Sequence, residues 1–172
     1  MCIRDRPGNQ HEGIRAENAW LTVDESTFED QPYGVVLAGT DPFADVYGPS
    51  TVSDSDFSTT MTGIELMTYD IRQEGEDGQF NIFDKNEFKS GLQGICVTER
   101  SPVLITNSDF ATTELGVFIQ NGGVDYDNRV DQNDFMSTLQ RGCCFDGSNN
   151  DLQFWANCFR GSSVSDLSLI HI

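Results

Sequence analysis

The sequence is poor in the residues on which much catalytic chemistry depends. It has only 2 histidines, His11 and His171, and its only lysines are Lys85 and Lys89. This scarcity argues against histidine-based triads and zinc sites. No CxxC motif, glycine-rich phosphate loop or Asn-x-Ser/Thr sequon is present, so thioredoxin-like redox chemistry, phosphate-loop nucleotide binding and N-glycosylation have no support. Paired carboxylates alone do not identify a glycosidase in so acidic a chain. We therefore predict a protein that is not an enzyme.

The sequence also lacks an excess of positive charge and any long apolar run. Its formal net charge is −18, from 28 acidic and 10 basic side chains. An acidic surface repels phosphate backbones, so we expect no nucleic-acid partner. No apolar run approaches the roughly 20 residues of a membrane helix, so we expect no membrane insertion. The 12 phenylalanines and 2 tryptophans supply enough core material to argue against global disorder.

The first and last six residues match the DNA ends that transposon-based sequencing libraries carry. The peptide Met-Cys-Ile-Arg-Asp-Arg at 1–6 is encoded by such an end, and the peptide at 167–172 by its reverse complement. We therefore expect both peptides to be sequencing-adaptor artefacts. Residues 7–166 are then a metagenomic fragment of a longer natural protein.

The clearest positive feature is internal repetition. The segment at 81–93, NIFDKNEFKSGLQ, returns at 128–140 as NRVDQNDFMSTLQ, and SDFSTT at 55–60 returns as SDFATT at 108–113. We predict tandem units of roughly 50 residues. The predicted boundaries are a lead-in with a partial unit at 7–50, unit 1 at 51–97, unit 2 at 98–144, and the start of a possible further unit at 145–166. This period suits propeller blades, stacked solenoid coils or small serial α+β modules.

The local pattern predicts a mainly β or α+β fold, in which each unit has strands, an acidic turn and a short capped helix. Asp84 and Glu87 have the spacing of a capping box, and Phe88 and Leu92 lie at i and i+4 on one helical face. Gly94 would end this helix. The segment 131–142 copies the pattern. Strands are expected at 19–23, 34–39, 64–71, 95–97, 103–106 and 116–120.

Because each unit has its own predicted helix, we favour serial modules over the other architectures. Adjacent units would then bury a shared core. This core would contain the predicted helix residues Phe88, Leu92, Phe135 and Leu139. We also assign Trp20 and Trp155 to buried positions rather than to ligand platforms.

The segment 125–135, DYDNRVDQNDF, resembles the second half of an EF-hand or dockerin-type calcium loop. The resemblance implies that Asp125 and Asp127 are calcium ligands and that Asp134 is the final carboxylate. We include Asp131 in the predicted metal site. Gly123 in the first ligand position departs from the pattern, and so does an aspartate where the final glutamate is usual. Turns that are capped without any metal are the alternative.

Four cysteines lie between the two artificial ends, Cys96, Cys143, Cys144 and Cys158. An even number suits disulfides in an oxidising compartment, and Cys96 and Cys143 occupy equivalent positions in the repeat. Buried free thiols are the alternative.

Together these features predict a non-enzymatic extracellular or cell-surface repeat protein used for adhesion or assembly. Its partner would be a protein or a glycan, and calcium is a candidate stabilising ion. A virion structural protein and an accessory binding module of a carbohydrate-active enzyme are the alternatives.

Overall fold

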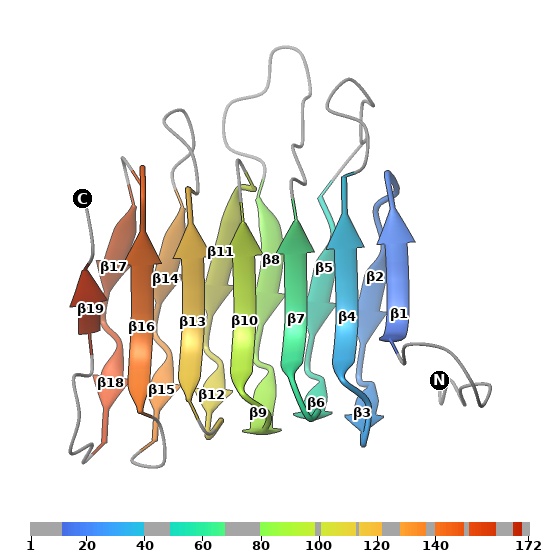
Figure 1. Cartoon of the computed structure of the whole chain (residues 1–172), viewed down its shortest axis with the longest axis horizontal. Coiled ribbons are helices and arrows are strands. Elements are labelled where there is room, and N and C mark those ends of the chain that lie inside the picture. Colours follow the sequence, from blue (N-terminus) through green and yellow to red (C-terminus); the bar gives the residue numbers. More distant parts are fainter. Residues whose placement is uncertain are drawn as a thin grey trace.

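The chain winds into a stack of coils whose strands form three parallel sheets (Figure 1). The computed structural model describes residues 12–39, 49–67, 80–98, 101–112, 114–121, 128–136, 140–149, 152–160 and the backbone of 167–169. Each complete coil contributes one strand to each sheet. Every described strand pairing is parallel, because neighbouring strands come from successive coils that run in the same direction.

The three sheets are named here by their strands. Sheet A has 7 strands, β1 (Glu12–Glu17), β4 (Tyr33–Ala38), β7 (Thr62–Met67), β10 (Gln93–Thr98), β13 (Leu115–Gln120), β16 (Arg141–Asp146) and β19 (Leu167–Leu169). Sheet B has 6 strands, β2 (Thr22–Asp24), β5 (Thr51–Ser53), β8 (Asn81–Asp84), β11 (Val103–Thr106), β14 (Arg129–Asp131) and β17 (Gln153–Trp155). Sheet C has 6 strands, β3 (Thr27–Glu29), β6 (Asp56–Ser58), β9 (Glu87–Ser90), β12 (Asp109–Phe110), β15 (Asp134–Phe135) and β18 (Cys158–Phe159).

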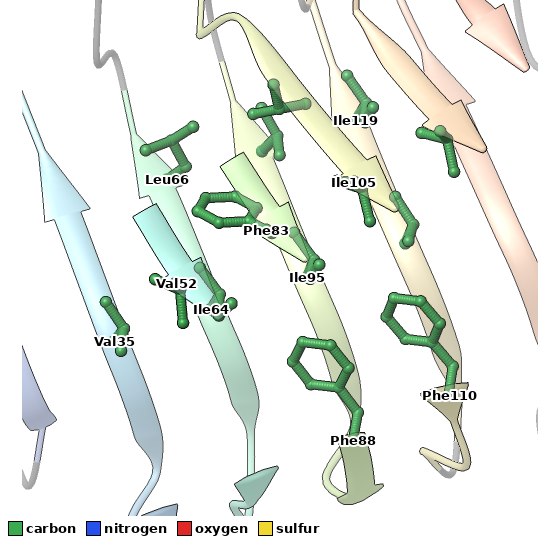
Figure 2. Packing of buried hydrophobic residues seen from close by; sticks show 14 of the residues in the cluster. Val35, Val52, Ile64, Leu66, Phe83, Phe88, Ile95, Ile105, Phe110 and Ile119 are labelled. Atoms are coloured by element: carbon green, nitrogen blue, oxygen red, sulfur yellow. The ribbon is translucent and has the colours of Figure 1, made fainter. Parts of the chain in front are cut away.

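The core fills the space between the sheets, and equivalent positions of successive coils carry similar apolar residues. Val52, Phe83 and Ile105 lie in register on sheet B, and all are fully buried. Figure 2 shows these side chains facing those of sheet A, such as Ile64 and Ile95. Alternation with outward polar residues is the period-2 pattern of strands with one buried face.

A stack of phenylalanine rings runs the length of sheet C. Neighbouring ring centroids are 4.7–4.9 Å apart, with planes inclined by 5–13°. The spacing equals the distance between neighbouring strands of about 4.8 Å, so each coil adds one ring. The stacked residues are Phe28, Phe57, Phe88, Phe110, Phe135 and Phe159.

A ladder of serine and asparagine side chains supports the corner between sheets B and C. Each corner has one residue with positive φ, for example Lys85 at 54° and Gln132 at 56°. The next residue accepts a hydrogen bond from the preceding coil. Ser108 N donates to Asn133 Oδ1 at 2.9 Å, and Asn133 N donates to Asn157 Oδ1 at 3.0 Å. These bonds satisfy buried backbone donors that the strands do not pair.

The predicted helices are wrong, because the part of the chain that the structure describes contains no helix. The supposed capping box at Asp84 and Glu87 is the corner between β8 and β9. Phe88 is fully buried but Leu92 is 41% exposed, so their i, i+4 spacing does not mark a common face. Phe135 is buried on β15, whereas Leu139 lies outside the described residues. Serial modules are therefore wrong, and the solenoid that we considered beside them is correct.

The repeat of roughly 50 residues corresponds to two coils rather than to one unit. Asn81 pairs with Val103 in the next coil, and Val103 N donates to Asn128 Oδ1 at 2.9 Å in the coil after that. Asparagine and serine alternate in part of the ladder, and this makes every second coil most similar in sequence. We therefore mistook a two-coil period for the structural unit.

The predicted equivalence of Cys96 and Cys143 is off by one residue. Cys143 shares a row with Ile95 through Val117, and Cys144 shares a row with Cys96 through Phe118. A slip of one residue turns a side chain to the opposite face of a strand. All four cysteines are free, so the disulfide prediction is wrong. Burial, assisted by the Glu65 carboxylate, raises the pKa of the Cys96 thiol to about 11.

Most of the predicted strands are confirmed. The expected strands at 34–39, 95–97, 103–106 and 116–120 coincide with β4, β10, β11 and β13 within two residues. Strand β19 falls in the segment attributed to adaptor DNA; its backbone pairs with β16, and this pairing does not bear on the origin of the segment. Among the described residues, no helix could cross a membrane.

Candidate functional site

The outer faces of β14, β15, β17 and β18 gather an exposed tryptophan, two aspartates and an arginine. On sheet B, Asp131 of β14 lies in register with Trp155 of β17. Val130 and Phe154, one residue earlier, belong to the core side. The alternation of strands therefore directs Asp131 and Trp155 outward, side by side.

Trp155 is a fixed, solvent-exposed platform. It is 53% exposed, and its main chain is held by the ladder residue Asn157. Asn157 Nδ2 donates to Trp155 O at 3.1 Å and to Val130 O at 2.8 Å. Trp20, at the other end of the described chain, is 58% exposed. Our assignment of both tryptophans to the core is therefore wrong.

Asp131 has a carboxylate that no described residue contacts by a hydrogen bond or an ion pair. Only 7% of the residue is exposed, so few atoms of its side chain reach solvent. An external group that donates hydrogen bonds or carries positive charge is a suitable partner for this carboxylate.

Asp134 begins β15 on the other side of the corner. Its Oδ2 accepts from Arg160 Nη2 at 2.5 Å, whereas its Oδ1 is buried and has no hydrogen-bond partner among the described residues. The Arg160 side chain is 68% exposed. This guanidinium can therefore contact a ligand while it holds Asp134.

Asp134 is also the end of a row of acidic side chains on sheet C. Asp56, Glu87, Asp109 and Asp134 lie in register on successive strands. Lys89 Nζ bridges Asp56 and Glu87 at 2.8 and 3.3 Å. Partial burial and then the charges of Asp134 and Glu87 raise the pKa of Asp109, although Arg160 opposes this shift. Asp109 therefore holds a proton more readily than an isolated aspartate.

The predicted calcium ligands are only partly described. Asp131 and Asp134 flank the corner between sheets B and C, and Asp125 and Asp127 lie outside the described residues. The exiting helix implied by the EF-hand resemblance is strand β15. The described residues contain no group of three or more side chains able to hold a metal ion. Calcium binding by the four aspartates stays a prediction.

Our reading of the sequence missed Trp155, Arg160 and Asp109 as site residues. A signal for Trp155 was present in the sequence. An asparagine follows two residues after Trp155, as Asn133 follows two residues after Asp131, so Trp155 and Asp131 precede equivalent corners. Equivalent corners place equivalent residues on the same face, so an exposed tryptophan could have been inferred. Arg160 and Asp109 carried no comparable signal.

This arrangement is suited to a sugar polymer. An exposed indole can stack on the apolar face of a sugar ring. The Asp131 carboxylate on the neighbouring strand can accept hydrogen bonds from hydroxyl groups, and Asp134 and Arg160 beyond the corner can accept and donate them. Neighbouring strands are about 4.8 Å apart, so the outer faces offer a polar side chain at each coil to an extended ligand.

Comparison with known proteins agrees with the architecture. A family model described as "Right handed beta helix region" matches residues 12–168. No curated protein and no solved structure gave a match. The family match overturns our prediction of a non-enzyme, because this fold is typical of pectate lyases and glycosidases. The fold is also common in surface proteins and other carbohydrate-active enzymes. Given three parallel sheets built from successive coils and a match over almost the whole chain, this protein belongs to the right-handed β-helix family.

Proposed function

We propose that this β-helix recognises a polysaccharide, as part of a secreted or cell-surface protein or of a carbohydrate-active enzyme. The observation that carries this proposal is the in-register pair of Trp155 and Asp131, an exposed tryptophan beside an aspartate whose carboxylate has no hydrogen bond or ion pair among the described residues. The exposed indole of Trp155 offers an apolar ring face on which a sugar ring can stack.

The site has the composition expected for sugar recognition. Trp155 supplies the stacking surface, Asp131 supplies a carboxylate on the neighbouring strand, and Asp134 with Arg160 supplies polar groups on the other side of the corner. Its position on strands, rather than on loops, reduces the ordering that binding requires. The family is one in which carbohydrate-active proteins are common.

Binding to a panel of soluble oligosaccharides tests the proposal. The panel contains neutral β-linked oligomers, amino-sugar oligomers and oligomers of uronic acids, and binding is measured by isothermal titration calorimetry. We expect Trp155→Ala to weaken binding by about tenfold or more, equivalent to about 1.4 kcal/mol. Trp20→Ala is the matched control and should bind like the wild type. Absence of binding to every oligosaccharide class would contradict the proposal.

Cleavage of the bound glycan is a second candidate, favoured by the unequal environments of Asp109 and Asp134. Asp109 has a raised pKa and suits a proton donor, while Arg160 holds Asp134 by an ion pair. Neighbouring strands are about 4.8 Å apart, close to the carboxyl separation of about 5–5.5 Å in retaining glycosidases. In that reaction Asp109 would protonate the leaving oxygen while Asp134 attacks the anomeric carbon through Oδ2, which breaks the glycosidic bond. The Asp109 carboxylate would then take a proton from the water that displaces Asp134 and releases the sugar.

The assay for cleavage is the release of reducing ends from the oligosaccharide that binds best. Asp109→Asn and Asp134→Asn should each abolish release, and Asp24→Asn on β2 should leave it unchanged. Binding without any release of reducing ends would reject cleavage and leave recognition intact.

A further inference from the structure

We infer that the site around Trp155 and Asp131 selects a sugar that carries a positive charge, such as an amino sugar with a free ammonium group. This inference rests on the proposed recognition of a polysaccharide and adds the charge of the ligand. Two features of neighbouring strands lead to it, the aromatic face of Trp155 and the Asp131 carboxylate, which has no hydrogen bond or ion pair among the described residues.

The first feature is the exposed indole of Trp155. A cation above the face of a tryptophan ring is attracted by the ring quadrupole, and tryptophan is the aromatic residue that favours this contact most. No basic side chain of the described residues lies over the indole, and the cation–π contact among these residues joins Arg129 to Phe80, with Cζ 5.6 Å from the ring centroid. The platform therefore remains available to an external cation.

The second feature is the neighbouring Asp131 carboxylate. The residue is 7% exposed, and the described residues supply neither a hydrogen bond nor an ion pair to its carboxylate. An ammonium group placed between the indole and this carboxylate would donate hydrogen bonds to Asp131 and would neutralise its charge. A neutral hydroxyl would satisfy only the hydrogen bonding.

The surrounding charge acts in the same direction. Lys89 compensates Asp56 and Glu87, and Arg160 compensates Asp134. Asp109, between the two groups, has no ion pair within the described chain. With a formal net charge of −18, the protein attracts cationic polymers and repels polyuronates. On sheet C, four successive coils each carry one acidic side chain in the same row, which suits a polymer whose charge repeats along its length.

The test compares two oligomers of β-1,4-linked glucosamine of equal length, one fully N-acetylated and one fully deacetylated. Titration calorimetry is performed in mildly acidic buffer that contains a metal chelator. We expect the deacetylated oligomer to bind about tenfold more tightly, in keeping with a cation–π contact and a charge pair that together supply about 1.4 kcal/mol. High salt should reduce this preference.

The variant Asp131→Asn should remove the preference while it leaves the affinity for the acetylated oligomer within about twofold, since it keeps the shape and only removes the charge. Asp24→Asn is the matched control, because Asp24 occupies the same row of sheet B in another coil, where Ser53 donates to its carboxylate at 2.8 Å. This variant should keep the preference. Melting temperatures of both variants confirm that they fold.

The outcomes separate this inference from the proposed function. Equal affinity of the wild type for both oligomers would overturn the charge preference and would leave polysaccharide recognition intact. A preference that survives in Asp131→Asn would also overturn the assignment of the site. Binding of neither oligomer, nor of any other class in the panel, would overturn both.

Discussion

Single polar side chains hold the corners of this β-helix, and Asn133 is one of them. It is 2% exposed. Its Oδ1 accepts from Ser108 N at 2.9 Å, and its Nδ2 donates to Ile105 O and to Asn157 Oδ1, both at 3.0 Å. The amide therefore connects three successive coils.

We predict that Asn133→Ala destabilises the fold by about 3 kcal/mol, because it leaves a buried N–H and a buried carbonyl without partners. For a chain of this size the melting temperature should fall by roughly 6–12 °C, as measured by calorimetry or circular dichroism. Gln153→Ala, at an exposed strand position, should change stability by less than about 0.5 kcal/mol. Equal losses in the two variants would show that the ladder adds nothing.

The second prediction at this scale concerns Asp109 and pH. Its pKa in the folded chain is raised by partial burial and by Asp134 and Glu87. The folded chain then binds more protons than the unfolded chain in the range above about pH 4, the ordinary value for aspartate. By linkage, stability falls as pH rises through the folded pKa of Asp109.

Asp109→Asn should therefore stabilise the protein at neutral pH, by less than about 1 kcal/mol because the side chain is partly screened by water. The gain should disappear at a pH low enough to protonate the aspartate in both states. Urea unfolding at several pH values measures this difference. A gain that does not depend on pH would mean that the carboxylate charge is not its cause.

At the scale of the strands, the sequence permitted good predictions wherever apolar runs stood between turn residues. Gly34–Gly39 and Val103–Thr106 were recognised in this way and are β4 and β11. The short strands of sheet C could not be recognised, because two to four residues are too few to show a period. The i, i+4 spacing of Phe88 and Leu92 resembles a helical face by chance. A lysine in a sequence does not indicate a positive φ, so the corner at Lys85 could not be predicted.

The glycines were also difficult to interpret from the sequence alone. Gly94 and Gly142 were interpreted as the ends of helices, and Gly63 and Gly116 as the starts of strands. In the structure these four residues share one row of sheet A. A Cβ at Gly94 would lie 2.6 Å from Phe110 Cδ1 and 2.7 Å from Gly116 O. The row is glycine because the phenylalanine stack occupies the space.

We predict that Gly94→Ala lowers the free energy of unfolding by about 3 kcal/mol or more, the upper end of the range usual for overpacking. The reason is that both the Phe110 ring and the backbone at Gly116 would have to move. Gln93→Ala is the neighbouring control and should be close to neutral. Chemical denaturation of both variants measures the difference. A neutral Gly94→Ala would show that the stack is loosely packed.

At the scale of the whole molecule, the reactivity of Cys96, Cys143, Cys144 and Cys158 towards a thiol reagent tests the fold. Cys143, Cys144 and Cys96 are at most 8% exposed, and Cys158 is exposed. In a Cys2→Ser background, a thiol reagent should label one cysteine rapidly in the native protein and all four in denaturant. Reducing agents should leave the melting temperature unchanged, because no disulfide joins these residues. Rapid labelling of all four under native conditions would contradict the arrangement.

Calcium remains a testable prediction at the same scale. If Asp125, Asp127, Asp131 and Asp134 bind the ion only in the folded chain, free calcium at 100 times the dissociation constant should add about 2.7 kcal/mol of stability. Melting curves with calcium and with chelator measure this shift. Identical melting temperatures would reject the site. Asp24→Asn is the control, because Asp24 is an aspartate outside the predicted site, and this variant should keep the shift.

The ladder, the ring stack and the glycine row have a consequence for how such a chain changes in length. Every described coil places a serine or an asparagine at the corner and adds one phenylalanine ring to the stack. A genetic slip that deletes or duplicates one whole coil therefore rejoins matching surfaces and leaves no unpaired layer. The binding face would become shorter or longer by one step, so the reach of the protein along its ligand can evolve without a redesign of its interior.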